Sequence, residues 1–115
     1  MSAPARLTRF EAGSAVARTE LPELAWGEFE SALLAGVEQG HRVVGLFGAA
    51  EEQSTRLYLV MADDRGARLA AGTTAIEGES WPSLTPRCPQ VHLFEREIAE
   101  QLGLRPEGHP WPRPV

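Results

Sequence analysis

Three strand-like runs between residues 42 and 76 constrain the fold more than any other part of the chain. They are rich in β-branched, aromatic and other apolar residues and cover 42–47, 56–61 and 68–76. The second linker is only Asp-Asp-Arg-Gly, which predicts an antiparallel hairpin of the second and third strands. The nearly continuous apolar character of the first two runs predicts central strands covered on at least one face.

A helical pattern precedes the strands. Apolar residues recur every three or four positions from Trp26 to Val37, which predicts an amphipathic helix that packs on the core. Pro22 suits the first turn of this helix, and Gly40 suits its end. Further upstream, residues 14–18 form a weak strand pattern.

A second helix is predicted from about Pro89 to Leu102. Its apolar residues fall on one stripe: Val91, Phe94, Ile98 and Leu102. Gly103 suits a left-handed cap at its end. The order helix, three strands, helix predicts an α+β fold, a two-layer sandwich with a small mixed or antiparallel sheet packed against two main helices. We expect one domain over residues 1–104 and a proline-rich exit tail or linker over 105–115.

Composition excludes several classes of function. The 115-residue chain has a net charge of -5 and contains no lysine, which argues against nucleic-acid binding. No apolar run reaches the roughly 18 to 20 residues that span a bilayer, so direct membrane insertion is not expected. The N-terminus lacks a hydrophobic signal core, which favours a cytoplasmic protein. The single Cys88 excludes an internal disulfide and a four-thiolate iron–sulfur cluster within the chain.

Three consecutive charges, Glu95, Arg96 and Glu97, interrupt the second helix. Successive helical residues differ by about 100°, so the three cannot share one face. They fit a solvated helix face, with Glu95 and Glu97 flanking the apolar stripe and Arg96 pointing away from it. They also fit an ion-pair cluster, with Arg96 bound bidentately to a carboxylate in this domain or across an interface. No pair of carboxylates stands out for acid–base work, so no catalytic residue is predicted.

Cys88, His92 and His109 offer an alternative, because catalytic zinc sites use three protein ligands. The chain would then be a small metal-binding enzyme or sensor. The simpler interpretation makes Cys88 a buried apolar residue, His92 a capping or interface side chain, and His109 a hydrogen-bonded anchor in a turn. Trp111, in the proline-rich tail, is a candidate for a partner contact.

The last third of the chain resembles a known signature. Its parts are Pro-Ser-Leu-Thr-Pro at 82–86, His-Leu-Phe-Glu-Arg-Glu at 92–97, Gly103, and Glu-Gly-His-Pro at 107–110. Their order and spacing resemble the 30-kilodalton subunit family of respiratory complex I, the NADH–quinone oxidoreductase (NADH dehydrogenase). A similar domain forms the N-terminal part of the large subunit in membrane-bound nickel–iron hydrogenases.

The resemblance implies a two-layer α/β domain with a non-catalytic, cofactor-free role, which braces redox-active subunits of an oxidoreductase complex. The implied partners are a large subunit (49-kilodalton-like or hydrogenase-like) and a small iron–sulfur subunit, on the inner face of the cell membrane. No activity of the chain alone and no metal are expected. The implied signature or interface residues are Glu95, Arg96, Glu97, Gly108, His109, Pro110 and Trp111.

Two details bear on the branch of the family. Pro106 and the shortness of the chain are closer to the hydrogenase branch. Trp111 stands where the family often has aspartate. Family members usually continue beyond the signature, so the native protein is expected to be either longer or a stand-alone short form.

Overall fold

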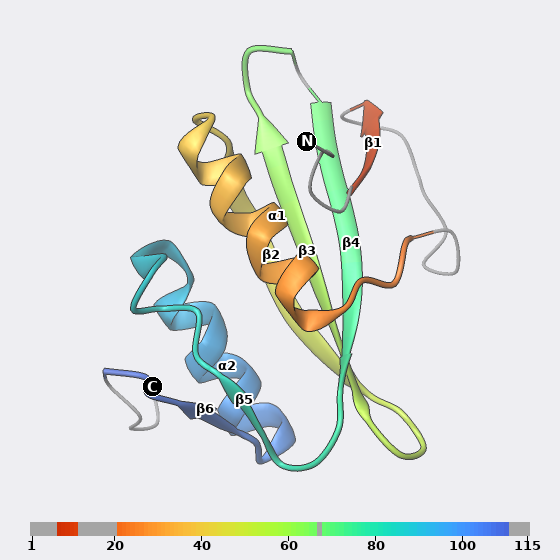
Figure 1. Cartoon of the computed structure of the whole chain (residues 1–115), viewed down its shortest axis with the longest axis vertical. Coiled ribbons are helices and arrows are strands. Elements are labelled where there is room, and N and C mark those ends of the chain that lie inside the picture. Colours follow the sequence, from red (N-terminus) through yellow and green to blue (C-terminus); the bar gives the residue numbers. More distant parts are fainter. Residues whose placement is uncertain (1–6, 12–20, 67, 111–115) are drawn as a thin grey trace.

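A four-stranded sheet and two helices make up most of the structure, a computed structural model that describes residues 7–11, 21–66 and 68–110 (Figure 1). The sheet consists of β1 (Thr8–Glu11), β2 (Arg42–Ala50), β3 (Thr55–Asp63) and β4 (Arg68–Ile76). The helices are α1 (Trp26–Glu38) and α2 (His92–Leu102), and a short 3-10 turn, η2 (Pro89–Val91), leads into α2. Two short strands, β5 (Ser80–Pro82) and β6 (Arg105–Glu107), form a second sheet.

The four-stranded sheet is antiparallel throughout, with the order β1-β4-β3-β2. The predicted α+β class and the hairpin of the second and third strand-like runs, β3 and β4, are therefore confirmed. The prediction that the first run is a central strand is wrong, because β2 lies at the edge of the sheet. The apolar side chains of β2 pack against α2 instead.

Both helices lie on one side of the sheet (Figure 1). Alternate residues of β3 point toward them, and Leu57, Leu59 and Met61 are fully buried in the core. The stripe predicted for α2 is confirmed, since Val91 and Ile98 are buried and its other two members pack against the same core. On the other side of the sheet, Phe47 stacks on Tyr58 with ring centroids 5.0 Å apart.

The first helix begins later than the position of Pro22 predicted. α1 starts at Trp26, whereas Pro22 and Leu24 pair with β4. The amide of Thr73 donates to the Pro22 carbonyl at 2.9 Å, and the Leu24 amide donates to the Thr73 carbonyl at 2.7 Å. A proline can accept such a sheet hydrogen bond although it cannot donate one. This segment therefore extends the sheet alongside β4 before the chain turns into the helix.

Three strands were not predicted. β1 lies upstream of the weak pattern at 14–18, and that pattern falls outside the described residues. β5 and β6 pair in parallel, with Trp81 opposite Pro106. Each is three residues long and contains a proline, so neither shows strand periodicity in the sequence. Their pairing holds residues 105–107 beside β5, and the boundary between a domain and an exit tail stays a prediction.

Candidate functional site

The carboxylate of Glu95 is the centre of the signature region. Glu95 lies in the first turn of α2 and is 0% exposed. Its Oε1 accepts hydrogen bonds from the hydroxyls of Ser83 (2.6 Å) and Thr85 (2.7 Å) and from the Thr85 amide (3.3 Å). Its Oε2 accepts from Trp81 Nε1 (2.7 Å) and the Leu84 amide (2.8 Å). We call these five residues the Glu95 clasp.

Local sequence explains how the clasp forms. The hydroxyl of Ser83 also accepts from the Thr85 amide at 3.2 Å, a side-chain-to-backbone turn that serine favours. The Cys88 amide donates to the Leu84 carbonyl at 2.9 Å and closes the next turn. The two turns leave the amides of Leu84 and Thr85 pointing at α2, where the carboxylate accepts both.

The clasp is suited to holding segments together. Two backbone amides, an indole N–H and two hydroxyls converge on one carboxylate, which matches the acceptor-only character of an ionised carboxyl group. Charge-assisted hydrogen bonds of this kind are about twice as strong as neutral ones. Because Glu95 has no exposed surface, its carboxylate is used inside the fold.

The prediction that Glu95 lies on a solvated helix face is wrong. The stripe of α2 faces the sheet, and Glu95 flanks that stripe as expected. The flank is covered by the segment 80–85, which packs beside α2 through the second sheet. Arg96 is half-buried and Glu97 is exposed. Whether these two residues form ion pairs across an interface stays a prediction.

The other predicted signature residues lie where the chain leaves α2. Gly103 has the left-handed conformation (φ 69°) expected of the helix cap, and Gly108 also has a positive φ (85°). His109 is buried, with its Nε2 3.2 Å from the His92 carbonyl oxygen, and a proton on Nε2 makes this a hydrogen bond. The prediction of a structural anchor at His109 is confirmed. Pro110 is exposed, and Trp111 lies outside the described residues.

The structure does not assemble the alternative metal site. Among the described residues, no group of three His, Cys, Asp or Glu side chains is close enough to hold a metal ion. His109 approaches the backbone of His92 instead. Cys88 is a buried free thiol, and burial raises its pKa, so it stays protonated at neutral pH and is a poor metal ligand.

Sequence reasoning missed Trp81, Ser83, Leu84 and Thr85 as partners of Glu95. The hydroxyls stand in the signature string at 82–86, but the resemblance depends only on the order and spacing of its parts. A combined signal is present: a Ser-x-Thr turn, which offers hydroxyls and free amides, lies about ten residues before the glutamates that flank an apolar stripe. Which of the two flanking glutamates turns inward depends on the packing of the segment 80–85.

The fold and the clasp define a small α+β domain whose signature carboxylate is bound internally. The sequence matches the family described as the 30 Kd subunit of respiratory-chain NADH dehydrogenase over residues 23–115, so the chain belongs to that family. No curated protein sequence matches the chain. Membership in a family of subunits implies partner subunits, within an oxidoreductase complex associated with the membrane.

In the part of the chain that the structure describes, no helix is long and apolar enough to cross a membrane.

Proposed function

We propose that the protein is a non-catalytic assembly subunit, or assembly domain, that braces the large and small redox subunits of its complex. The observation that carries the proposal is the use of the signature glutamate. A glutamate is suited to acid–base chemistry, yet the carboxylate of Glu95 is buried and saturated with hydrogen bonds inside the domain. A carboxylate fixed in this way holds the segment 80–85 against α2, and a rigid domain is what a brace requires.

The contact face that we propose is the outer side of α2 together with the exit from β6. Leu93 on α2 is 52% exposed, the largest exposure of any big apolar side chain in the described residues. The hydrogen bond from His109 to the His92 carbonyl brings the exit segment next to it. Exposed Glu97 lies one turn further along α2. An apolar centre with a charged rim is the usual anatomy of an interface between proteins.

The proposal includes two branches. In the first, the complex is a complex I-like NADH dehydrogenase, and family membership supports this branch. In the second, it is a membrane-bound nickel–iron hydrogenase, a branch that Pro106 favours. Both branches place the protein on the cytoplasmic, inner face of the cell membrane through its complex. Both also give it a large partner and a small iron–sulfur partner.

Affinity purification of the tagged chain from its native cells tests the proposal. We expect the large and small redox subunits to be recovered with it, and their cofactors identify the branch: a nickel–iron centre indicates a hydrogenase, and NADH oxidation indicates complex I. Recovery of the chain without either redox subunit under mild salt would contradict the assembly role.

A pair of variants tests the face. Leu93→Asp places a charge in the proposed apolar centre and should reduce recovery of both partners at least roughly tenfold, because burying an unpaired charge is costly. Val44→Asp is the matched control, since Val44 is 43% exposed on β2. It should leave recovery within about twofold of the wild type. Equal losses in the two variants would show that α2 is not the contact face.

A further inference from the structure

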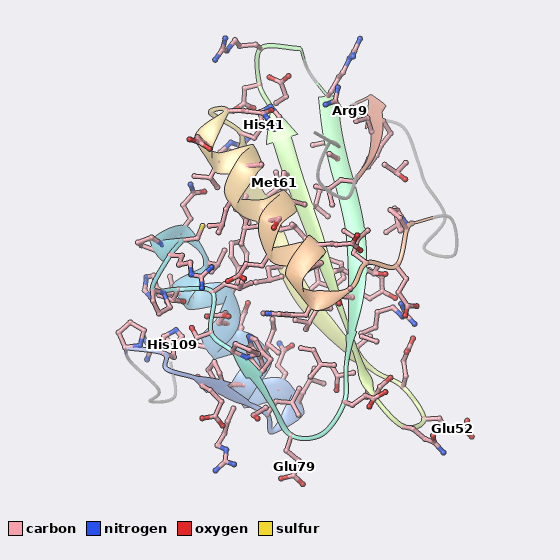
Figure 2. All side chains as sticks on the ribbon, in the orientation of Figure 1. Arg9, His41, Glu52, Met61, Glu79 and His109 are labelled. Carbon is pink, nitrogen blue, oxygen red and sulfur yellow. The ribbon has the colours of Figure 1, made fainter. Side chains whose placement is uncertain are left out.

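A cavity of about 230 Å³ opens at the end of the sheet where α1 stops and β3 turns into β4. Buried Met61 and half-buried Ala70, which are register partners on one face of the sheet, contribute its apolar lining, and Arg9, His41 and Arg68 contribute polar walls. Figure 2 shows Arg9 and His41 at this end of the molecule, with Glu52 and Glu79 at the other end. The cavity is therefore separate from the Glu95 clasp and from the proposed contact face of α2.

The register of the strands places two guanidinium groups on one face. Arg9 of β1 lies opposite Ala70 of β4, and Arg68 is two residues before Ala70. Diagonal neighbours of this kind are about 7–8 Å apart, and side chains as long as arginine reach one another. Among the described residues, no ion pair includes Arg9 or Arg68. Two like charges at this spacing favour an anion between them.

The acidic residue Asp63 limits the charge of that anion. Asp63 lines the same cavity, with its Oδ2 3.9 Å from His41 Nε2 and its Oδ1 accepting from the Arg65 amide at 3.2 Å. A dianion such as a phosphate monoester would be repelled by Asp63 more strongly than a singly charged group. A singly charged group that also carries an N–H donor fits better, because Asp63 can accept from it.

We propose that this cavity binds the carboxylate at the C-terminal end of a peptide chain. The carboxylate lies between Arg9 and Arg68, the last amide N–H donates toward Asp63, and the last side chain packs on Met61 and Ala70. A terminal residue with an apolar side chain combines these three features within the volume available. The same chemistry has two sources, the C-terminus of a partner protein and a free N-acyl amino acid.

Titration of the full chain with N-acetyl-leucine, followed by amide chemical shifts, tests the proposal. We expect saturable shifts at Ala70, Leu69 and His41 with a Kd on the order of 1 mM, a value suited to so small a ligand. N-acetyl-leucinamide has the same shape without the charge and should bind at least roughly tenfold more weakly. A tetrapeptide that ends in leucine distinguishes the sources. Tighter binding than N-acetyl-leucine points to a protein C-terminus, and equal binding points to the free acid.

Matched variants locate the site. Arg68→Gln should weaken N-acetyl-leucine binding by about tenfold, because a charge-assisted hydrogen bond is lost. Arg105→Gln removes the same charge from exposed β6, far from the cavity, and should change the Kd by less than about twofold. Both arginines are exposed, so unchanged amide spectra outside the cavity confirm that each variant is folded.

Three results would overturn the proposal. The first is the absence of shifts at about 20 mM N-acetyl-leucine, well above the expected Kd. The second is an equal loss of affinity in Arg68→Gln and Arg105→Gln, which would indicate non-specific attraction. The third is tighter binding of inorganic phosphate than of N-acetyl-leucine, which would assign the cavity to a different anion.

Discussion

Two charged side chains each tie distant segments of the molecule together, one inside the fold and one at its surface. In the Glu95 clasp, a carboxylate without exposed surface accepts five hydrogen bonds from the segment 81–85. In the second cluster, which we call the Arg56 cluster, the guanidinium of β3 donates to Glu51 at 2.8 Å, Glu23 at 2.9 Å and Thr73 at 3.2 Å. The two clusters therefore have similar connectivity, but the Arg56 cluster is partly exposed to solvent and the Glu95 carboxylate is not.

Because of this difference in exposure, a similar number of hydrogen bonds should stabilise the fold to different degrees in the two clusters. Surface ion pairs contribute little because water and salt screen them, whereas removing one partner of a buried charged cluster leaves the others without hydrogen bonds. The side chain of Arg56 is 22% exposed, and its partners Glu51 and Glu23 are more exposed still. We therefore expect the clasp to contribute most of the stability of the second sheet. The Arg56 cluster should stabilise the hairpin of β2 and β3 by a smaller amount.

The largest effect is expected from Glu95→Ala. The variant leaves the Trp81 indole and the amides of Leu84 and Thr85 buried without their acceptor, so unfolding in denaturant should show a loss on the order of 3–5 kcal/mol. Glu97→Ala, which removes an exposed carboxylate from the same helix, should change the free energy of unfolding by less than about 0.5 kcal/mol. A loss below about 1 kcal/mol in Glu95→Ala would mean that the clasp is no stronger than a surface cluster.

Cys88 reports on the clasp without unfolding the protein. Its thiol is buried, its amide is bonded to the Leu84 carbonyl, and burial raises its pKa, so reaction with a thiol reagent requires the segment to open. Glu95→Ala should speed labelling at neutral pH at least roughly tenfold, because the free energy required for local opening falls. Arg56→Gln should leave the labelling rate unchanged, since it acts on the other sheet. If the labelling rate of each variant, Arg56→Gln included, instead rises in step with its loss in the free energy of unfolding, the thiol reacts through global unfolding.

The comparison also explains what the sequence predicted and what it did not. Local patterns gave correct predictions: the stripe of α2, the hairpin of β3 and β4, and the left-handed cap at Gly103. Each depends on residues close together in the chain. The burial of Glu95 depends on a segment ten to fourteen residues away and on a three-residue strand with no periodicity of its own. The sequence placed the signature residues but not the direction in which the glutamate points.

A smaller effect is expected from Arg56→Gln. Two partly exposed ion pairs are lost together with the hydrogen bond to Thr73, so the free energy of unfolding should fall by about 1 kcal/mol. Because salt screens surface charges, this difference from the wild type should shrink in 1 M NaCl, where the Debye length is about 3 Å. The loss in Glu95→Ala should be the same at both salt concentrations. A salt-independent loss in Arg56→Gln would place this cluster in the same energetic class as the clasp.

The smallest effect is the acid response of the Arg56 cluster. The hydrogen bond from Arg56 lowers the pKa of Glu51 below its ordinary value of 4.5. A carboxyl group whose pKa is lower in the folded state stabilises the fold above its unfolded pKa, and this contribution is lost as pH falls through the folded pKa. The free energy of unfolding of the wild type should therefore decline below about pH 4.5. In Glu51→Gln this decline should be smaller. Glu52→Gln, which changes the neighbouring exposed carboxylate, is the control and should keep the full decline. Identical acid profiles of the wild type and Glu51→Gln would show that the pairing with Arg56 does not persist in solution.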